Sequence, residues 1–523
     1  MMNQSLPKKL KFFKEPRLAF GYNQPAIDPR DGLLLFGPYE RLAPYSLKAG
    51  VVGTQQGLKL YRDFAKKINQ PIQSKKNSYG KIISDEVSRP SFPGFEAVFD
   101  VQWPLKEEIF FKVKKSDISR LLIERNKQVR TSSLVDFYIS KILKAVNEED
   151  VEINIWFIIV PVEIYNACKP QSKGSSFSKG TKKYIELSKH GQKALPFDGQ
   201  ESYEDEISKY LSSSVDFHDL LKARLIHEGI NTPVQLILEP TLDFRDKDTR
   251  KKYPDNIKAH LAWTQSTTLY YKLGKLPWKL NDIRDGVCYL GLVFKKLDHL
   301  NESKRVCSAA QMFLKDGDGS VFRGNIGLWQ GDKPYEFHLN KKSAESLLGL
   351  ALDDYHNKWN KYPNELFIHG KIHFHNEEWE GFQEALKDRN AKTKLTGIVI
   401  KEYRGLKLFR DVEGEISNYG VLRGVAYIIS DQEGYLFTRG FIPRLNTSSS
   451  LEIPNPLQVK ISKGEADIET VLKDVLALTK LNYNACIYGD GLPVTLKFSD
   501  SIGKILTATK NWKVNKRQFK YYI

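Results

Sequence analysis

Hydrophobic positions along the chain alternate between short continuous runs and helical stripes. Residues 153–160 (INIWFIIV) form an apolar run that is typical of a strand buried on both faces. A second strand is predicted at Val234–Leu238. Helices are predicted around these strands over Ser116–Asn147, Phe217–Glu228 with Asp216 as its N-cap, and Ile257–Lys272. This order of helices and strands predicts a Rossmann-like α/β unit.

A second unit is predicted after Pro277, with adjacent strands first and alternating helices and strands afterwards. Its predicted strands are Val287–Lys295, Val306–Leu314, Glu365–Ile368 and Leu395–Ile400. Its predicted helices are Lys342–Lys361, Glu377–Lys387, Ala466–Lys480 and Ser499–Leu506. That order is typical of an RNase H-like domain. After the second of these strands, Asp316–Gly319 leads on to Val321 and is interpreted as a tight hairpin turn, because a calcium loop would need other residues at its first and twelfth positions.

The chain is therefore predicted to be an α/β protein of three parts. They are an α/β N-terminal segment (residues 1–110), a Rossmann-like domain (111–280) and an RNase H-like domain (281–523). In the first part we expect strands at Gly32–Phe36 and Lys48–Val52 and a helix at Gln56–Ile68. The glycines 50, 53 and 57 lack phosphate-loop spacing, so they indicate an ordinary strand-to-helix turn. The polar run 173–183 is predicted to be a loop or linker.

The charge balance favours a polyanionic partner. Eighty Lys and Arg residues against 63 Asp and Glu give a net charge of +17, and the excess is spread along the chain. Lys and Arg release condensed counterions when they meet phosphates, although a solvated basic surface is an open alternative. The four cysteines lie far apart, which disfavours a disulfide framework and a zinc knuckle and fits a cytoplasmic protein. No apolar stretch suits a membrane span or a signal peptide.

Several segments together resemble the MID and PIWI domains of short prokaryotic Argonautes, over residues from about Asp28 to Ile523. The resemblance is nearest to the Argonaute subunit of SPARTA systems, whose partner is a separate TIR–APAZ protein. The segments that carry it are Phe217-His-Asp-Leu-Leu-Lys-Ala-Arg-Leu, Tyr271-Lys-Leu-Gly-Lys, Gly286-Val-Cys-Tyr-Leu-Gly-Leu-Val-Phe-Lys-Lys, Ala309-Ala-Gln-Met-Phe-Leu-Lys-Asp-Gly-Asp-Gly, Glu365-Leu-Phe-Ile-His-Gly, Asn376-Glu-Glu-Trp, Leu476-Ala-Leu-Thr-Lys-Leu-Asn-Tyr-Asn-Ala and Phe519-Lys-Tyr-Tyr-Ile.

The resemblance implies a pocket for the 5′-phosphate of a guide strand. His218 and Lys222 are four residues apart, so they share one face of the predicted helix. They match positions at which family members stack on the first base and contact the phosphate, and Lys272 matches a second phosphate lysine. Without the resemblance, each of these residues would be interpreted as an ordinary surface residue.

The predicted pocket departs from the family pattern at two positions. Thr268 stands where the family carries a lysine, and Pro233 stands where many members carry a glutamine, with Gln235 close by. Mg²⁺ at the guide 5′ end would compensate for the lost charge. The resemblance implies that the C-terminal carboxylate of Ile523 helps to hold this ion.

The acids of a slicing PIWI domain are missing. Two-metal nucleases need clustered carboxylates that hold two ions about 3.5–4 Å apart. Val293 and His369 occupy the first two acid positions, and Asp500 alone lies near the last. His369, His373 and His375 would share a face of an extended strand, but zinc binding is disfavoured against backbone contact or surface exposure.

The resemblance thus implies a catalytically inactive, guide-RNA-loaded sensor of complementary single-stranded plasmid or phage DNA in prokaryotic immunity. The chain and its TIR–APAZ partner would form a heterodimer. Target capture would then assemble these heterodimers into a higher oligomer and activate the NADase of the partner. Two alternatives stay open. The chain could be a guide-directed nuclease with a non-standard site around Asp500 and the histidines, or the same sensor with a sirtuin-like or other effector.

Overall fold

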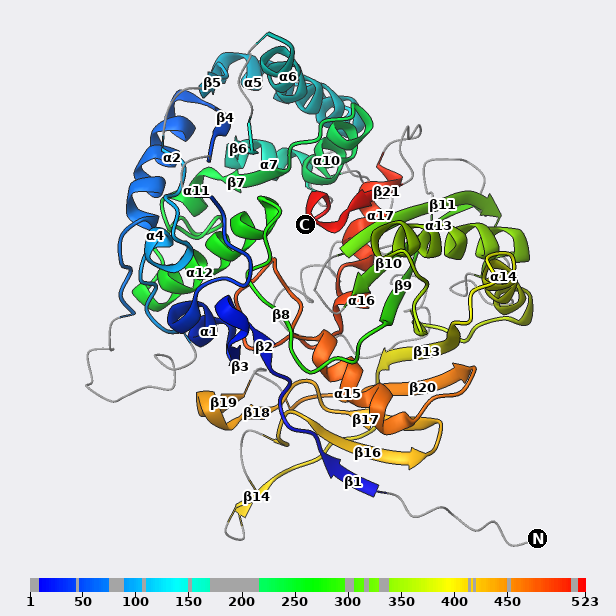
Figure 1. Ribbon diagram of the computed structural model, residues 1–523. Coiled ribbons are helices and arrows are strands. Elements are labelled where there is room, and N and C mark those ends of the chain that lie inside the picture. The colour runs from blue at the N-terminus through cyan, green and yellow to red at the C-terminus, as the bar shows by residue number, and fades with distance from the viewer. Residues whose placement is uncertain are drawn as a thin grey trace, which may run out of the picture.

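The computed structural model describes residues 9–43, 47–74, 89–105, 110–148, 153–169, 216–296, 305–314, 319–328, 338–412, 415–416, 420–448, 453–508 and 516–523. They form two lobes, and the end of the chain lies between them (Figure 1). One lobe is built on a four-stranded sheet and the other on a ten-stranded sheet. The predicted loop at 173–183 lies outside the described residues, and so does most of the predicted turn at 316–319.

The smaller sheet is a parallel sheet covered by helices on both faces, as the Rossmann-like prediction requires. Its strands, in spatial order, are β5 (Phe110–Lys112), β4 (Ala49–Gly53), β6 (Ile155–Val160) and β7 (Val234–Leu238). One face packs on α5 (Lys115–Leu122), α6 (Lys127–Glu148), α7 (Val162–Cys168) and α10 (Phe217–His227). The other packs on α2 (Gln55–Ile68), α4 (Phe95–Phe99), α11 (Glu239–Leu242) and α12 (Asp255–Lys272). Strand β6 is therefore buried at every position.

The four-stranded sheet continues across the boundary predicted between residues 110 and 111. Strand β4 comes from the N-terminal segment, yet it pairs with both β5 and β6 in the middle of the sheet. The turn after β4 is an ordinary helix start, because Thr54 caps α2 by accepting a hydrogen bond of 2.9 Å from the backbone N–H of Gly57. The elements β4, α2, α4 and β5 are thus part of the same structural unit as the Rossmann-like domain.

The strand predicted at Gly32–Phe36 is wrong, because these residues belong to helix α1 (Pro29–Phe36). The Asp28 side chain accepts from the backbone N–H of Arg30, and Pro29 occupies the first helical position. Proline there has the φ of a helix and lacks only an N–H that would have no helical partner. The local start signal outweighs the apolar run Leu33–Phe36 that suggested a strand.

The larger sheet has the order β1-β16-β17-β20-β13-β12-β9-β10-β11-β21. Its strands are β1 (Lys9–Phe12), β9 (Val287–Lys296), β10 (Arg305–Leu314), β11 (Gly319–Leu328), β12 (Glu365–Gly370), β13 (Lys394–Glu402), β16 (Val425–Ser430), β17 (Glu433–Leu436), β20 (Leu457–Lys463) and β21 (Lys516–Gln518). The first three strands of the predicted RNase H-like unit, β9, β10 and β11, are antiparallel neighbours. Strand β12 then lies parallel between β9 and β13.

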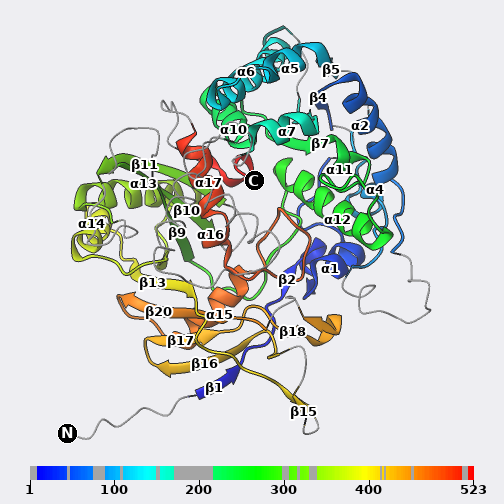
Figure 2. The same cartoon turned by 180° about the vertical axis from the view of Figure 1, so that it is seen from behind.

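Helices cover both faces of this sheet near its centre (Figures 1 and 2). On one face α13 (Lys341–Trp359) and α14 (Asn376–Lys387) pack on side chains such as Leu290 and Met312. On the other face the core contains residues of α15 (Ile468–Leu478), α16 (Val494–Lys497) and α17 (Ser499–Thr507) together with Tyr289 and Phe313. Alternate residues of β9 and β10 therefore enter different cores.

Short elements complete the fold. They are the sheet of β2 (Leu18–Ala19), β3 (Pro25–Ala26) and β8 (Lys279–Leu280), the pairs β14 (Asp411–Val412) with β15 (Glu415–Ile416) and β18 (Phe441–Ile442) with β19 (Thr447–Ser448), and the 3₁₀ turns Gly21–Asn23, Pro443–Leu445 and Phe519–Tyr521. Strands β2 and β8 join the start of the chain to the segment between the two lobes. Within the described residues, no helix is long and apolar enough to cross a membrane.

Candidate nucleic-acid interface

Lys222 lies on α10 and points its ammonium group at the end of the chain. Its side chain is only 4% exposed. Nζ donates to the backbone oxygen of Ile523 at 2.6 Å and to that of Tyr522 at 3.2 Å. Burial lowers the pKa of Lys222 to about 8, although nearby Asp219 opposes the shift. The last residue of the sequence therefore lies directly against a predicted phosphate lysine.

Lys272 lies at the end of α12 and is equally buried. Its Nζ donates to the backbone oxygen of Val234 at 2.9 Å and to Oε1 of Gln235 at 2.5 Å. Burial, and then the positive charge of Lys222, hold the pKa of Lys272 well below its usual value. The two predicted lysines are thus close enough to repel each other, and Gln235 belongs to the same group.

Thr268 and His218 complete the set of predicted residues. Thr268 lies one turn before Lys272 and is buried, and its hydroxyl donates to the backbone oxygen of Thr264 at 2.9 Å. Nδ1 of His218 lies 3.0 Å from a carboxylate oxygen of Asp219, and 45% of the His218 side chain is exposed. Asp216 caps α10 as predicted by accepting from the backbone N–H of His218 at 3.1 Å.

Elements far apart in the sequence therefore meet at one buried, positively charged point. Helix α10, strand β7, helix α12 and the end of the chain contribute to it. Lys222 and Lys272 are held by main-chain oxygens, one of them at Ile523, and by the amide oxygen of Gln235, and neither lysine forms an ion pair with a carboxylate side chain of a described residue. Burial lowers the pKa of both lysines, and a bound anion would stabilise their charged forms, so the arrangement favours an anionic ligand.

The three residues predicted to occupy nuclease-acid positions lie on β9, β12 and α17. Val293 lies on β9, which is the neighbour of β12. His369 on β12 is 1% exposed, and its Nδ1 is 2.8 Å from the hydroxyl oxygen of Thr495. Burial lowers its pKa to about 3, so the imidazole is neutral near pH 7. Asp500 on α17 is 62% exposed and pairs with Lys504 at 3.0 Å.

The three predicted histidines do not converge. His369 is inside the sheet, whereas the exposed His373 contacts the hydroxyl of Ser462 at 3.2 Å. The ring of His375 stacks on that of His338, with 3.4 Å between the centroids. In the described part of the chain, no group of three or more His, Cys, Asp or Glu side chains is arranged to hold a metal ion.

Comparison with solved structures finds the same architecture. Clostridium butyricum Argonaute, solved with a guide DNA and a target DNA, matches 99% of this chain at 16% sequence identity with a TM-score of 0.62. Aquifex aeolicus Argonaute (13% identity, TM-score 0.54) and Drosophila Piwi (11%, 0.53) match 99% and 98% of it. The fold is that of an Argonaute. The chain spans 55%, 57% and 56% of the lengths of these three proteins. No protein-family model and no curated sequence matches it.

Within the Argonaute fold, the smaller lobe is the Rossmann-like MID part and the ten-stranded lobe is the RNase H-like PIWI part. Two contacts of the buried pocket escaped the sequence analysis, namely the Asp219 carboxylate beside His218 and the backbone oxygen of Tyr522. Asp219 directly follows His218 in the quoted segment, so it could have been found there. The Tyr522 contact uses backbone and has no signal in side-chain identity.

Proposed function

We propose that this chain loads a short 5′-phosphorylated guide RNA and uses it to recognise complementary single-stranded DNA of invading plasmids or phages. The observation that carries the proposal is the pair of buried lysines, Lys222 and Lys272, which meet beside Ile523 at the end of the chain. A terminal phosphate would stabilise the charged form of both buried lysines. The Argonaute fold supports the same reading, because the Clostridium butyricum protein was solved with a guide and a target.

The proposed pocket binds the phosphate by charge and by converging donors. Lys222 and Lys272 donate from two different helices, which fixes the position of the phosphate as one cation would not. His218 is half-exposed on α10 and would stack on the first base. Thr268 contributes no charge, so the pocket has one cation fewer than the family pattern.

Mg²⁺ fits this pocket as a structural ion. It prefers oxygen ligands, and the pocket already collects backbone and amide oxygens at Ile523, Tyr522 and Gln235. Ile523 would hold the ion together with the guide phosphate, and the ion would supply the positive charge that Thr268 does not. The lysines themselves position the phosphate.

We further propose that the PIWI part binds the guide–target duplex without cutting it. His369 is buried and neutral, and it is engaged by Thr495 in place of a metal-binding acid. Asp500 is exposed and paired with Lys504, and in the described residues it belongs to no group of three or more His, Cys, Asp or Glu side chains that could hold a metal ion. Base pairing reads the sequence, and the chain needs only backbone contacts, which suits its diffuse charge of +17.

An inactive sensor needs a partner that acts. We propose the TIR–APAZ protein, whose NADase would be activated when target capture turns the heterodimer into a higher oligomer. Proteins co-purified from the natural host should include this NAD-hydrolysing polypeptide. If the co-purified protein is instead a nuclease, a sirtuin-like NADase or a membrane protein, the proposed partner is wrong and the sensor role remains.

The function is tested by loading the purified chain with a 5′-phosphorylated RNA and adding complementary or scrambled DNA with Mg²⁺ or Mn²⁺. We expect guide-dependent capture of the complementary strand, with the DNA left intact. Guide-dependent cleavage that is lost in Asp500→Ala would establish the alternative, a nuclease with a non-standard site. Absence of any guide-dependent capture would remove both.

A further inference from the structure

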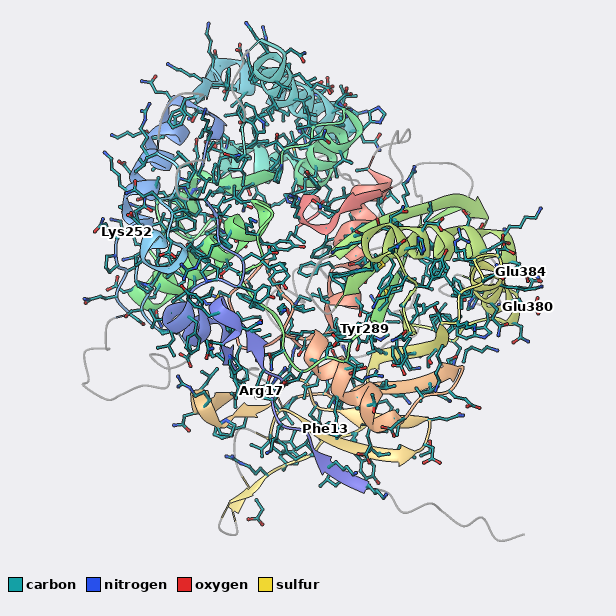
Figure 3. All side chains as sticks on the ribbon, in the orientation of Figure 1. Phe13, Arg17, Lys252, Tyr289, Glu380 and Glu384 are labelled. Carbon is teal, nitrogen blue, oxygen red and sulfur yellow. The ribbon has the colours of Figure 1, made fainter. Side chains whose placement is uncertain are left out.

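A second basic site lies on the MID part, away from the guide pocket. A hollow of about 590 Å³ opens between the end of α2, the segment after it, and the start of α12. Four lysines line it: Lys66, Lys67, Lys252 and Lys258. Its volume is within the range of ordinary ligand sites. Lys252 marks its position on the outer side of the lobe in Figure 3.

Three of these lysines are free to bind a ligand. Lys258 pairs with Asp255 at 2.7 Å. By contrast Lys66, Lys67 and Lys252 are exposed, and within the described residues none of their side chains has a hydrogen-bond or ion-pair partner. The end of α2 explains two of them, because lysines stabilise the negative end of a helix. It does not explain why Lys252, which comes from a loop nearly 200 residues later, lines the same hollow.

The rest of the lining fits an extended, phosphate-bearing chain. Asp243 is already engaged by Arg245, and Asp255 by Lys258, so neither acid neutralises the three free lysines. Apolar surface comes from Pro71, Ile72 and Phe244. Lysines act as mobile point charges without the fixed geometry of arginines, which suits a phosphodiester backbone of any sequence.

Helix α12 relates this hollow to the guide pocket. Lys258 lies near its start and Lys272 at its end, which places them about 21 Å apart at 1.5 Å per residue. The two strands of a duplex run in opposite directions. If Lys222 and Lys272 hold the guide 5′ end, the unpaired DNA on the 3′ side of the target leaves the duplex at this same end.

We propose that this hollow, which we call the outer lysine site (Lys66, Lys67 and Lys252), binds the backbone of the single-stranded DNA that follows the 3′ side of the paired target. This inference rests on the proposed function. The site would prefer a target embedded in a longer single strand over a target of guide length. It would do so without reading sequence, because phosphate contacts carry none.

The test compares three DNA targets on the guide-loaded protein: one of guide length, one with a 3′ single-stranded tail and one with a 5′ tail. Each contact between a lysine and a single-strand phosphate adds about 0.7 to the slope of log K against log salt. For three contacts, the 3′-tailed target should lose roughly 20-fold more affinity than the guide-length target between 50 and 200 mM salt. The 5′ tail should add nothing comparable.

The triple variant Lys66→Ala, Lys67→Ala, Lys252→Ala should abolish the advantage of the 3′ tail and leave binding of the guide-length target unchanged. The matched control is Lys342→Ala, Lys392→Ala, Lys394→Ala, which removes the same charge from exposed positions on the PIWI part. The inference is overturned if both triple variants still bind the 3′-tailed target more tightly than the guide-length target. It is also overturned if the 5′ tail strengthens binding as much as the 3′ tail does. Failure of the wild type to bind a guide would overturn the proposed function instead.

Discussion

Lys222 and Lys272 are the residues whose protonation most directly controls guide binding in this account. Burial has lowered the pKa of Lys222 to about 8 and holds that of Lys272 well below its usual value. A bound phosphate stabilises the charged ammonium and therefore raises both pKa values. The affinity for a phosphorylated guide is then greatest at pH values below the pKa of these lysines in the free protein. It falls as the pH rises above that pKa, because the free lysines must take up protons to bind the phosphate.

We therefore predict that affinity for a 5′-phosphorylated guide falls above about pH 8, by up to tenfold per pH unit for each proton taken up. A guide with a 5′-hydroxyl should show a nearly flat profile over the same range. Titrations of both guides by fluorescence anisotropy check this, with Lys222→Gln as the variant that should flatten the phosphate profile near pH 8. Parallel profiles for the two guides would contradict the assignment.

His369 gives a second prediction, on stability. Its pKa is about 3 in the folded chain against an ordinary 6.5, so below pH 6.5 the unfolded chain binds a proton that the folded chain does not. The free energy of unfolding should therefore fall with falling pH, by at most about 1.4 kcal/mol per unit from this residue. Unfolding midpoints of His369→Gln should depend less on pH between 6.5 and 5. His373→Gln, an exposed control, should behave like the wild type, and equal slopes in all three would show that His369 is not buried as described.

At the scale of elements, the start of the chain is anchored in the PIWI part. Strand β1 pairs with β16, and Glu15 just after it lies 3.0 Å from both Arg423 and Lys480, which are almost fully buried. These cations lower the pKa of Glu15 despite its burial. The Glu15 carboxylate is the counter-charge for two buried cations, Arg423 and Lys480. These ion pairs hold the N-terminal segment against the PIWI part.

Replacing Glu15 by glutamine should destabilise the protein by about 3–5 kcal/mol, because it leaves buried cations without their counter-charge. Glu469→Gln is the control, because it removes the partly exposed ion pair between Glu469 and Lys11 of β1. This variant should lower the free energy of unfolding by less than about 1 kcal/mol. Denaturant unfolding of the two variants measures the difference. Similar, small losses in both would mean that Glu15 does not neutralise this cluster.

The elements of the fold were largely predictable, with exceptions that have local causes. Continuous apolar runs and helical stripes predicted β6, β7, β9, α10 and α12 to within two residues. Helix α1 (Pro29–Phe36) differs from the predicted strand because two local signals compete. The apolar run Leu33–Phe36 indicates a strand, whereas Asp28 followed by proline starts a helix. The pairing of β4 between β5 and β6 could not be predicted, because it depends on contacts between segments about 60 and 105 residues apart.

The same limit applies to the binding residues. Single positions such as Lys222 and Lys272 could be proposed from their resemblance to a family motif. Their mutual repulsion and the contact with Ile523 required the fold. The outer lysine site shows this most clearly, since its lysines lie in two separate basic stretches of the sequence and only the fold brings them to one hollow.

At the scale of the whole molecule, the two lobes divide one task. The MID lobe holds a buried, positively charged pocket against the end of the chain, and the PIWI lobe offers a sheet in which His369 is buried beside Thr495. Both lobes have the Argonaute fold, and the chain spans just over half the length of the Argonautes compared. In the proposed function, recognition resides in this chain and chemistry in its partner.

The central claim is that Lys222 and Lys272 hold the 5′-phosphate of a guide. The most direct measurement compares binding of 5′-phosphorylated and 5′-hydroxyl guide RNA to the wild type and to Lys222→Ala, Lys272→Ala. Each charged hydrogen bond contributes about 1.5–3 kcal/mol, so the variant should lose on the order of 100-fold or more in affinity for the phosphorylated guide and little for the hydroxyl guide. Equal losses for both guides, or none for either, would contradict the account.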